Sequence, residues 1–274
     1  MLSYQHEYHA GCLADVHKHM ALSALLKLLT KSKKSLSYIE SHAGRGMYNL
    51  ASKEALKTGE AKAGIQLLQK ENRLLEDHPY THIIQDEQAE RGENFYPGSP
   101  LIALNLLRKD DHADLMELHP KEFQVLENNL SHLYSTRKGL STLDIHKEDG
   151  LEMALKLLPN SGDLTLLFVD PSYEIKAEYE KIVMFFEECV RKNEDVTLLL
   201  WYPMLNKRQH TPMAEALKSN FKETILHQEI LFADPAETSR MYGSGLLCFN
   251  APVAFAEELE KIASFFQENV YNPA

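Results

Sequence analysis

The sequence predicts an α/β fold: a mostly parallel sheet that ends in an antiparallel pair of strands and carries a small helical insertion. Short, almost continuously apolar runs such as 164–169 and 196–201 alternate with helical segments, as buried parallel strands do. Two later strand-like segments, 224–231 and 245–250, have no helix between them, which favours an antiparallel pair at one edge. A long segment rich in strong helix formers, 50–95, interrupts the first strand–helix–strand unit.

The composition is that of a globular protein able to bury a sizeable core. Of its 274 residues, 44% are hydrophobic and 25% are charged, so we expect one α/β domain with an insertion. The N-terminal stretch lacks the apolar region of a secretory signal, and no apolar run is long enough to span a bilayer. Three scattered cysteines without a C-x-x-C pair fit a reduced cytoplasmic protein. We expect a monomer that binds no membrane.

The formal net charge of −11 argues against indiscriminate binding to nucleic acid, because neutralising phosphates requires lysine and arginine. Two segments are nevertheless locally basic: 27–34, with four lysines and no acid, and 206–210. Each is explained at least as well by ordinary solvated surface charge.

The first elements are a helix and a strand that leads into a glycine-rich turn. Residues 14–30 carry leucine and methionine at helical spacing, and 36–41 is a short apolar strand that runs into the turn 42–46. A strand followed by such a turn typically opens a ligand-binding unit, with an acid about 20 residues further on. The next strand here, 113–118, brings its acid, Glu117, only after a gap several times longer.

An inserted helical subdomain over 50–95 accounts for this gap. The remaining segments, 1–49 and 96–274, then form the main domain. Where the chain returns, the sequence Tyr-Pro-Gly-Ser-Pro predicts that Ser99 caps a helix over 100–108, with proline at its first position.

Beyond this helix the two kinds of element alternate regularly. The expected helices are 121–134, 151–158 and 177–191, and the strands between them are 140–146, 164–169 and 196–201. Because ligands bind outside the carboxyl ends of parallel strands, residues that directly follow these strands are the candidates for a site.

The sharpest candidate is the Asp170-Pro171-Ser172-Tyr173 sequence, directly after the strand 164–169. The exocyclic amino nitrogen of adenine is a poor nucleophile, because its lone pair is delocalised into the ring. The carboxylate of Asp170 and the carbonyl of Pro171 could accept its two N–H groups, free the lone pair and stabilise the positive charge that develops. Tyr173 offers a face on which a base can stack. The alternative is a simple turn, but the strand–motif–helix context favours catalysis.

Acids after two other strands are suited to a nucleoside cofactor. Glu117 could accept both ribose hydroxyls, and Asp149, followed by Gly150, could accept an adenine amino group. The alternatives are an ordinary exposed acid and a helix N-cap, respectively. The turn 42–46 lets backbone approach a ligand closely, although it could also be a plain tight turn. It lacks the G-x-G-x-x-G pattern that a nicotinamide cofactor requires.

The N-terminus is rich in histidine and other polar residues: Tyr4, His6, His9, Asp15, His17, Lys18 and His19. A metal site is one interpretation, but the histidine spacing does not match a helical i, i+4 pair and no cysteine lies in a metal-binding arrangement. We therefore expect no metal. A lid that faces substrate and cofactor, or plain surface histidines, are the other interpretations.

Four motifs occur in a characteristic order: Y-x-H-x-Y-H-A-G-x-x-A-D-V-x-K-H from Tyr4, H-A-G-x-G-x-Y from His42, Y-P-G-S-P from Tyr96 and D-P-x-Y-E-I-K from Asp170. In this respect the whole chain resembles the RlmJ family of bacterial 23S ribosomal RNA adenine-N6 methyltransferases. Two positions depart from the family pattern: Ser172 stands where a second proline is usual, and Cys12 stands where asparagine is expected.

The resemblance implies a class I (Rossmann-like) sheet that binds S-adenosyl-L-methionine and releases S-adenosyl-L-homocysteine. Its substrate would be 23S rRNA, protein-free or partly assembled, methylated at adenine 2030 in the usual rRNA numbering. Asp170 would be the catalytic acceptor, and Tyr4, with Lys18 beside it, would contact the RNA. The implied cofactor-binding residues are His19, His42, Ser99, Glu117, Asp149, Gly150 and Asp170.

Three other functions remain open on the sequence. A DNA adenine methyltransferase would use the same D-P-x-Y chemistry, although no domain for reading a DNA target site is recognisable, and the RNA 2′-hydroxyl is what would distinguish the substrates. An N5-glutamine protein methyltransferase usually has asparagine as the first residue of the motif. A non-catalytic RNA-binding assembly factor on the same fold would be favoured by a damaged cofactor site.

Overall fold

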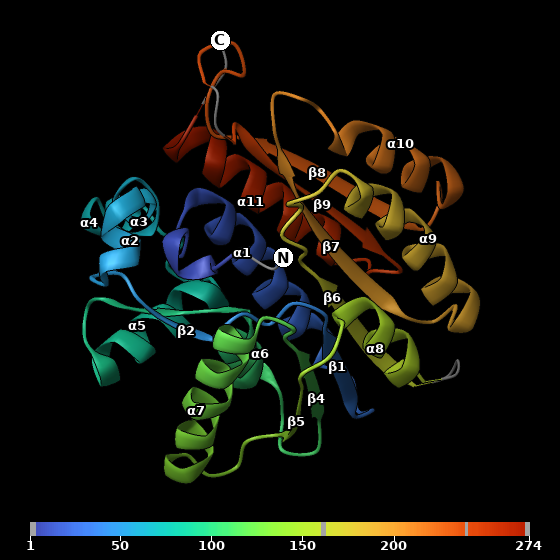
Figure 1. Ribbon diagram of the computed structural model, residues 1–274, viewed down its shortest axis with the longest axis horizontal. Coiled ribbons are helices and arrows are strands. Elements are labelled where there is room, and N and C mark those ends of the chain that lie inside the picture. The colour runs from blue at the N-terminus through green and yellow to red at the C-terminus, as the bar shows by residue number, and fades with distance from the viewer. Residues whose placement is uncertain (1–3, 160–162, 239–240, 272–274) are drawn as a thin grey trace.

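The computed structural model describes residues 4–159, 163–238 and 241–271, and its centre is a seven-stranded sheet (Figure 1). The strand order is β5-β4-β1-β6-β7-β9-β8. The strands are β1 (Leu36–Glu40), β4 (His112–Met116), β5 (Thr142–His146), β6 (Leu164–Val169), β7 (Thr197–Met204), β8 (Ile225–Leu231) and β9 (Gly243–Phe249).

Five neighbouring strands of this sheet are parallel, and β9 runs antiparallel to both β7 and β8. The expected fold class is therefore confirmed: a mostly parallel sheet finished by antiparallel strands. The chain order reverses at β1, which pairs with β4 on one side and with β6 on the other. In open α/β sheets this switch point is where a crevice forms at the carboxyl ends of the strands.

Helices cover both faces of the sheet. One face is covered by α1 (Leu13–Leu29), which contacts α6 (Ser99–Leu106) and α11 (Phe255–Asn269). On the other face, α8 (Gly150–Leu157), α9 (Ala177–Lys192) and α10 (His210–Asn220) follow one another (Figure 1). The remaining long helix, α7 (Pro120–Thr136), connects β4 to β5. None of the helices in the described part of the chain is long and apolar enough to cross a membrane.

The inserted segment is helical, as expected. It lies between β2 (Met47–Asn49) and β3 (Phe95–Pro97), which pair with each other in a separate two-stranded sheet. Its helices are α2 (Lys53–Thr58), α3 (Glu60–Ala63), α4 (Ile65–Lys70) and α5 (Pro79–Arg91), and the first three gather to one side of the sheet (Figure 1). Apolar residues of the insertion, such as Ile65 and Tyr80, belong to the same buried core as the sheet. The insertion is therefore packed into the domain.

The helix after the insertion begins one residue earlier than the sequence suggested. Gly98 is the N-cap of α6, and Ser99 is its first residue, so the expectation that Ser99 caps the helix was wrong. The Ser99 hydroxyl donates a 2.5 Å hydrogen bond to Glu40 Oε1 at the end of β1. This hydrogen bond to the buried Glu40 carboxyl group holds the Ser99 side chain towards the sheet, so it does not cap the helix.

Candidate active site

A cavity of about 340 Å³ opens at the carboxyl ends of β1, β4, β5 and β6. This volume lies at the lower end of the range for small-molecule sites. The cavity brings together ten of the eleven residues that the sequence put forward for the site: Tyr4, Lys18, His19, His42, Ser99, Glu117, Asp149, Gly150, Asp170 and Pro171. Segments far apart in the chain thus converge on one place.

Glu117 ties β4 to the glycine-rich turn. Its Oε2 accepts a 2.9 Å hydrogen bond from the Gly44 N–H, and its Oε1 accepts a 2.7 Å bond from the His119 N–H. Gly44 has a positive φ of 58°, and a Cβ there would lie 2.5 Å from the Tyr48 hydroxyl, so the turn needs glycine. Burial raises the pKa of Glu117 to about 7 despite these donors, so its charge is poised near neutral pH.

Asp149 and Gly150 begin α8 at the cavity wall. The Asp149 carboxylate caps the helix by accepting from the N–H groups of Leu151 and Glu152, so the N-cap interpretation holds. A Cβ on Gly150 would lie 1.7 Å from the Ser41 carbonyl oxygen, which means that only glycine lets the start of α8 approach the turn after β1 so closely.

Two of the histidines that line the cavity, His19 and His42, are uncharged at neutral pH. Burial lowers the pKa of His19 to about 3, and its Nδ1 lies 2.9 Å from the Tyr96 hydroxyl. Burial likewise lowers the pKa of His42, whose Nδ1 lies 2.8 Å from Ser41 Oγ. Neutral imidazoles can pack against or hydrogen-bond to a cationic cofactor without repelling it.

Glu40 is a fully buried carboxyl group at the end of β1, which the sequence analysis did not single out. It accepts from the hydroxyls of Ser99 and Tyr38, and its exposed fraction is 0%. Burial raises the pKa of Glu40 to about 8, so the group is mostly protonated at neutral pH. In the sequence, only its position as the last residue of the strand before the glycine-rich turn could have singled out Glu40.

Asp170 is held by a buried chain of ion pairs from the N-terminal segment. Lys18 Nζ donates a 2.6 Å bond to Asp170 Oδ2 and lies 2.9 Å from Asp15 Oδ1. Asp15 Oδ2 in turn lies 2.9 Å from His6 Nε2. Although burial alone would lower the pKa of Lys18, Asp15 and Asp170 raise it well above its usual value. Lys18 is therefore a fixed cation beside Asp170.

This position does not suit Lys18 for the RNA contact that the resemblance implied. Its ammonium is paired with two carboxylates, and the residue is only 3% exposed, so it has no free surface to offer a phosphate. The Lys18 ammonium also lies 5.1 Å from the centre of the Trp201 ring. Trp201, near the end of β7, lines the cavity and was not among the residues that the sequence marked.

The N-terminal aromatic residues lie at the mouth of the cavity. Tyr4 is partly exposed, its hydroxyl lies 2.8 Å from His6 Nδ1, and its ring stacks on that of His9 at 5.7 Å. His9 also contacts Glu60 of the insertion at 3.0 Å, and the buried His17 contacts Ser244 and Gln228 at 2.9 Å. The N-terminal segment therefore covers one side of the cavity, which Tyr4, His6 and His9 help to line.

Tyr173 is the exception among the predicted residues. It has a positive φ of 52°, and its ring is buried, only 6% exposed, against Tyr179 and Trp201. Its hydroxyl donates a 2.9 Å bond to the Trp201 carbonyl. The expectation that its face is open to a base does not hold for this conformation, because the left-handed backbone turns the side chain into the core.

Arg45 anchors the lid to the glycine-rich turn, a role the sequence did not reveal. Its guanidinium donates to Glu122 of α7 at 2.8 and 2.6 Å and forms an ion pair with Glu7 of the N-terminal segment. All three residues are largely buried. The sequence around Arg45, an arginine between two glycines, does not indicate that its partners are as distant in the chain as Glu7 and Glu122.

The strand order, the cavity at the switch point, the acid after β4 and the Asp-Pro sequence after β6 together define a class I S-adenosylmethionine-dependent methyltransferase. Within this class, residues 33–274 match the model of the family described as ribosomal RNA large subunit methyltransferase D, RlmJ. The chain belongs to this family, which confirms the resemblance found in its motifs.

Known relatives resemble the chain over nearly its whole length. The ribosomal RNA large subunit methyltransferase J of Haemophilus influenzae is 33% identical over 272 residues, covering 98% of this chain and 94% of the relative. The protein of the same name from Escherichia coli is 31% identical, covering 96% and 91%. A crystal structure of a Legionella pneumophila protein superposes with a TM-score of 0.81 at 31% identity and covers 96% of each chain.

Proposed function

We propose that this protein transfers the methyl group of S-adenosyl-L-methionine to the N6 amino group of one adenine in 23S rRNA. The observation that carries the proposal is the location of Asp170 and Pro171, which follow β6 and line the same cavity as Glu117, Asp149 and Gly150. The names of the relatives from Haemophilus influenzae and Escherichia coli support a ribosomal RNA substrate.

The residues around the cavity fit the cofactor. Glu117 offers carboxylate oxygens to the two ribose hydroxyls, and Asp149, beside Gly150 at the start of α8, offers an acceptor at the cavity wall. The uncharged His19 and His42 add no positive charge of their own beside the cofactor's cationic sulfonium. When bound, the cofactor supplies an electrophilic methyl group.

Asp170 and Pro171 would activate the adenine. The Asp170 carboxylate and the Pro171 carbonyl accept the two N–H groups of the amine, which localises the lone pair on nitrogen for attack on the methyl carbon. Lys18 donates to Asp170 Oδ2 and fixes the orientation of the carboxylate, while the second carboxylate oxygen would accept from the amine. The positive charge that appears on nitrogen is stabilised where it develops.

The acidic chain limits which RNA can serve as substrate. With a net charge of −11, it offers few cations to phosphates, so affinity for arbitrary RNA is weak. The target base must also leave its stack to reach a cavity this deep. We therefore propose protein-free or partly assembled 23S rRNA as substrate, with Tyr4 at the mouth of the cavity touching the RNA, and a monomer acting in the cytoplasm.

The test is methylation of purified, protein-free 23S rRNA lacking this modification, followed by mass spectrometry of its nucleosides. N6-methyladenosine at one site, mapped by nuclease fragments, is the expected product, and the Asp170→Ala protein should form almost none. A different methylated nucleoside, or equal methylation of a double-stranded DNA of matching sequence, would exclude the proposed specificity. Failure to bind the cofactor in a separate titration would indicate a non-catalytic factor.

A further inference from the structure

A second group of chemically reactive side chains lies away from the cavity, on the paired strands β4 and β5. Residues two apart in a strand share a face, and so do residues directly opposite each other in neighbouring strands. In the observed register, Asp114 pairs with Asp144, His112 precedes Asp114 by two residues, and His146 follows Asp144 by two. Two histidines and two acids therefore occupy one face at the edge of the sheet.

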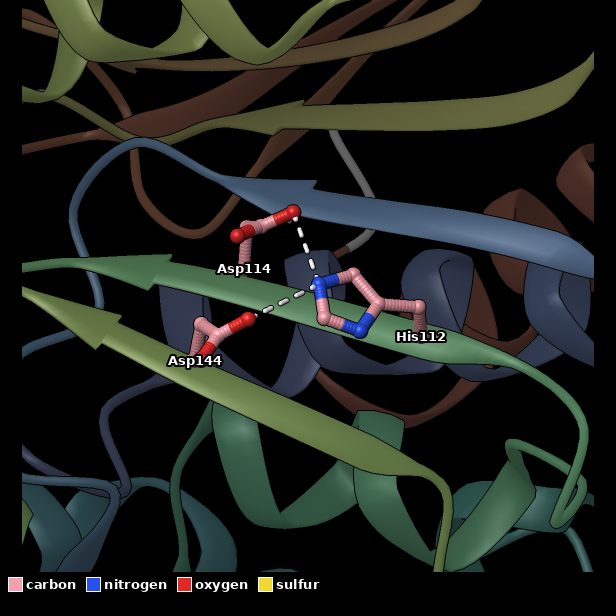
Figure 2. Close-up of side chains that lie close together, drawn as sticks. All are labelled: His112, Asp114 and Asp144. Atoms are coloured by element: carbon pink, nitrogen blue, oxygen red, sulfur yellow. Dashed lines mark ion pairs between the residues drawn. The ribbon is translucent and has the colours of Figure 1, made fainter.

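Three of these side chains converge on one point (Figure 2). His112 Nε2 lies 3.1 Å from Asp114 Oδ2 and 3.5 Å from Asp144 Oδ2, and the three atoms all lie within 4.8 Å of one another. In a tetrahedral zinc site with bonds of about 2.0–2.1 Å, ligand atoms lie roughly 3.3 Å apart. The two distances from the histidine nitrogen bracket this value.

The surrounding hydrogen bonds orient His112 for metal binding. The Thr142 hydroxyl donates to the Asp111 carbonyl at 3.3 Å, so its oxygen accepts from His112 Nδ1–H at 2.8 Å. With Nδ1–H engaged in this way, Nε2 is the ring nitrogen that faces the two carboxylates and would bind a metal ion. A proton on Nε2 can point at only one of these carboxylates, whereas a metal ion can contact both.

Asp114 is fixed in the same way. Its Oδ1 lies 2.8 Å from His146 Nε2, which leaves Oδ2 for the converging group. Metal-bound carboxylates are typically held by such an outer hydrogen bond. The Asp114 side chain is 9% exposed, whereas that of Asp144 is 67% exposed, so the point of convergence has a protected side and a side open to solvent. An ion could enter, and water could complete its coordination.

We propose that His112, Asp114 and Asp144 bind one divalent transition-metal ion of the Zn²⁺ class, with His146 orienting Asp114. One imidazole nitrogen and two carboxylate oxygens are a borderline donor set that such ions accept, and the two negative charges match a divalent cation. The site lies at the start of β4, whereas Glu117 follows the end of the same strand. The ion would cross-link the two strands that lead to the cofactor-binding edge, and it takes no part in methyl transfer.

Zinc titration of the tag-free, full-length protein, treated with a chelator and then desalted, tests this site. Calorimetry should show one binding event, and Asp144→Asn should weaken it at least tenfold because the variant lacks one ligand. Since the Asp144 side chain is mostly exposed and contributes little to packing, the variant should still fold. His146→Gln should weaken binding about ten- to a hundredfold, as loss of an outer partner does. Asp110→Asn, an exposed acid outside the cluster, is the matched control and should bind like the wild type.

Two further readouts separate this site from other histidines, which can also attract zinc. Cobalt substitution should give the intense visible bands of a tetrahedral ion in the wild type and lose them in Asp144→Asn. Zinc should raise the melting temperature of the wild type more than that of Asp144→Asn. Zinc binding that is identical in the wild type and in Asp144→Asn would overturn the proposal and leave His112 as a plain ion-pair partner.

Discussion

The ammonium of Lys18 lies 2.6 Å from the carboxylate of Asp170, and 152 positions of sequence separate the two residues. Lys18 comes from α1, near the N-terminus, and Asp170 follows β6 in the middle of the sheet. Because both charges are buried, each depends on the other, and removing one leaves the other without compensation. The N-terminal helix therefore contributes a side chain to the proposed active site and also covers the sheet.

Replacing Lys18 with methionine should slow methyl transfer by roughly a hundredfold or more, the usual effect of losing one preorganised electrostatic contact. Without the cation, the Asp170 side chain loses the hydrogen bond that orients it at the cavity. The measurement is the single-turnover rate of N6-methyladenosine formation, together with the melting temperature of each variant.

Lys27→Met is the control for this change, because Lys27 lies exposed on the same helix. It should leave both the rate and the melting temperature unchanged. If Lys18→Met retains the wild-type rate, the contact between Lys18 and Asp170 has no part in methyl transfer.

Asp170→Ala should reduce turnover by about two to three orders of magnitude, since the contact acts mainly where positive charge develops on nitrogen. RNA affinity should fall much less. Asp170→Asn keeps one acceptor oxygen and should retain partial activity. Single-turnover rates and a binding titration, measured on the same preparation of each variant, distinguish the two effects. If the alanine variant kept its activity, the Asp170-Pro171 motif would be only a structural turn without a role in catalysis.

Cofactor binding should depend on pH through Glu117. Its pKa is raised to about 7, so the group proposed to accept the ribose hydroxyls is only partly ionised at neutral pH. Affinity for S-adenosyl-L-homocysteine should therefore rise as the pH increases from 6 to 8. Glu117→Gln should bind more weakly, by roughly the 1.5–3 kcal/mol of a hydrogen bond to a charged group, and should lose this dependence.

Calorimetric titration at several pH values checks this prediction. The exposed Glu127 provides the matched control, and Glu127→Gln should behave like the wild type. A wild-type affinity that stays constant or falls over this range would contradict the role given to Glu117.

Local sequence patterns were sufficient to predict most of the sheet. The strand predicted over 164–169 coincides with β6, and the acid and glycine residues that follow the strands line the cavity. These features depend on hydrophobic runs and strand ends, which are local. The two helices α10 and α11 did not emerge, although Phe255, Leu259, Ile262 and Phe266 of α11 bury one face at helical spacing.

Contacts between distant segments could not be predicted in this way. Nothing near Lys18 indicates that Asp170 is its partner, and nothing near Arg45 indicates Glu7 or Glu122. Tyr173 misled the sequence analysis for a related reason: the direction of its ring depends on one backbone dihedral and on the space beside Trp201. Such relationships arise only when the chain is folded.

Glu40 should make the stability of the protein fall as the pH rises. Its folded-state pKa of about 8 lies above the 4.5 of an ordinary glutamate, so the folded protein binds more protons between these values. The stabilising contribution is therefore complete below about pH 4.5 and is lost as the pH rises through 8.

Glu40→Gln keeps the shape and an acceptor for the Ser99 and Tyr38 hydroxyls without titrating. Melting temperatures measured at pH 5, 7 and 9 should show this variant gaining on the wild type with each step. Glu93→Gln, at an exposed position, should follow the wild type throughout. A difference between Glu40→Gln and wild type that is constant across this range would mean that Glu40 is already ionised at pH 5, and that the Ser99 and Tyr38 hydroxyls stabilise a buried carboxylate instead of a carboxylic acid.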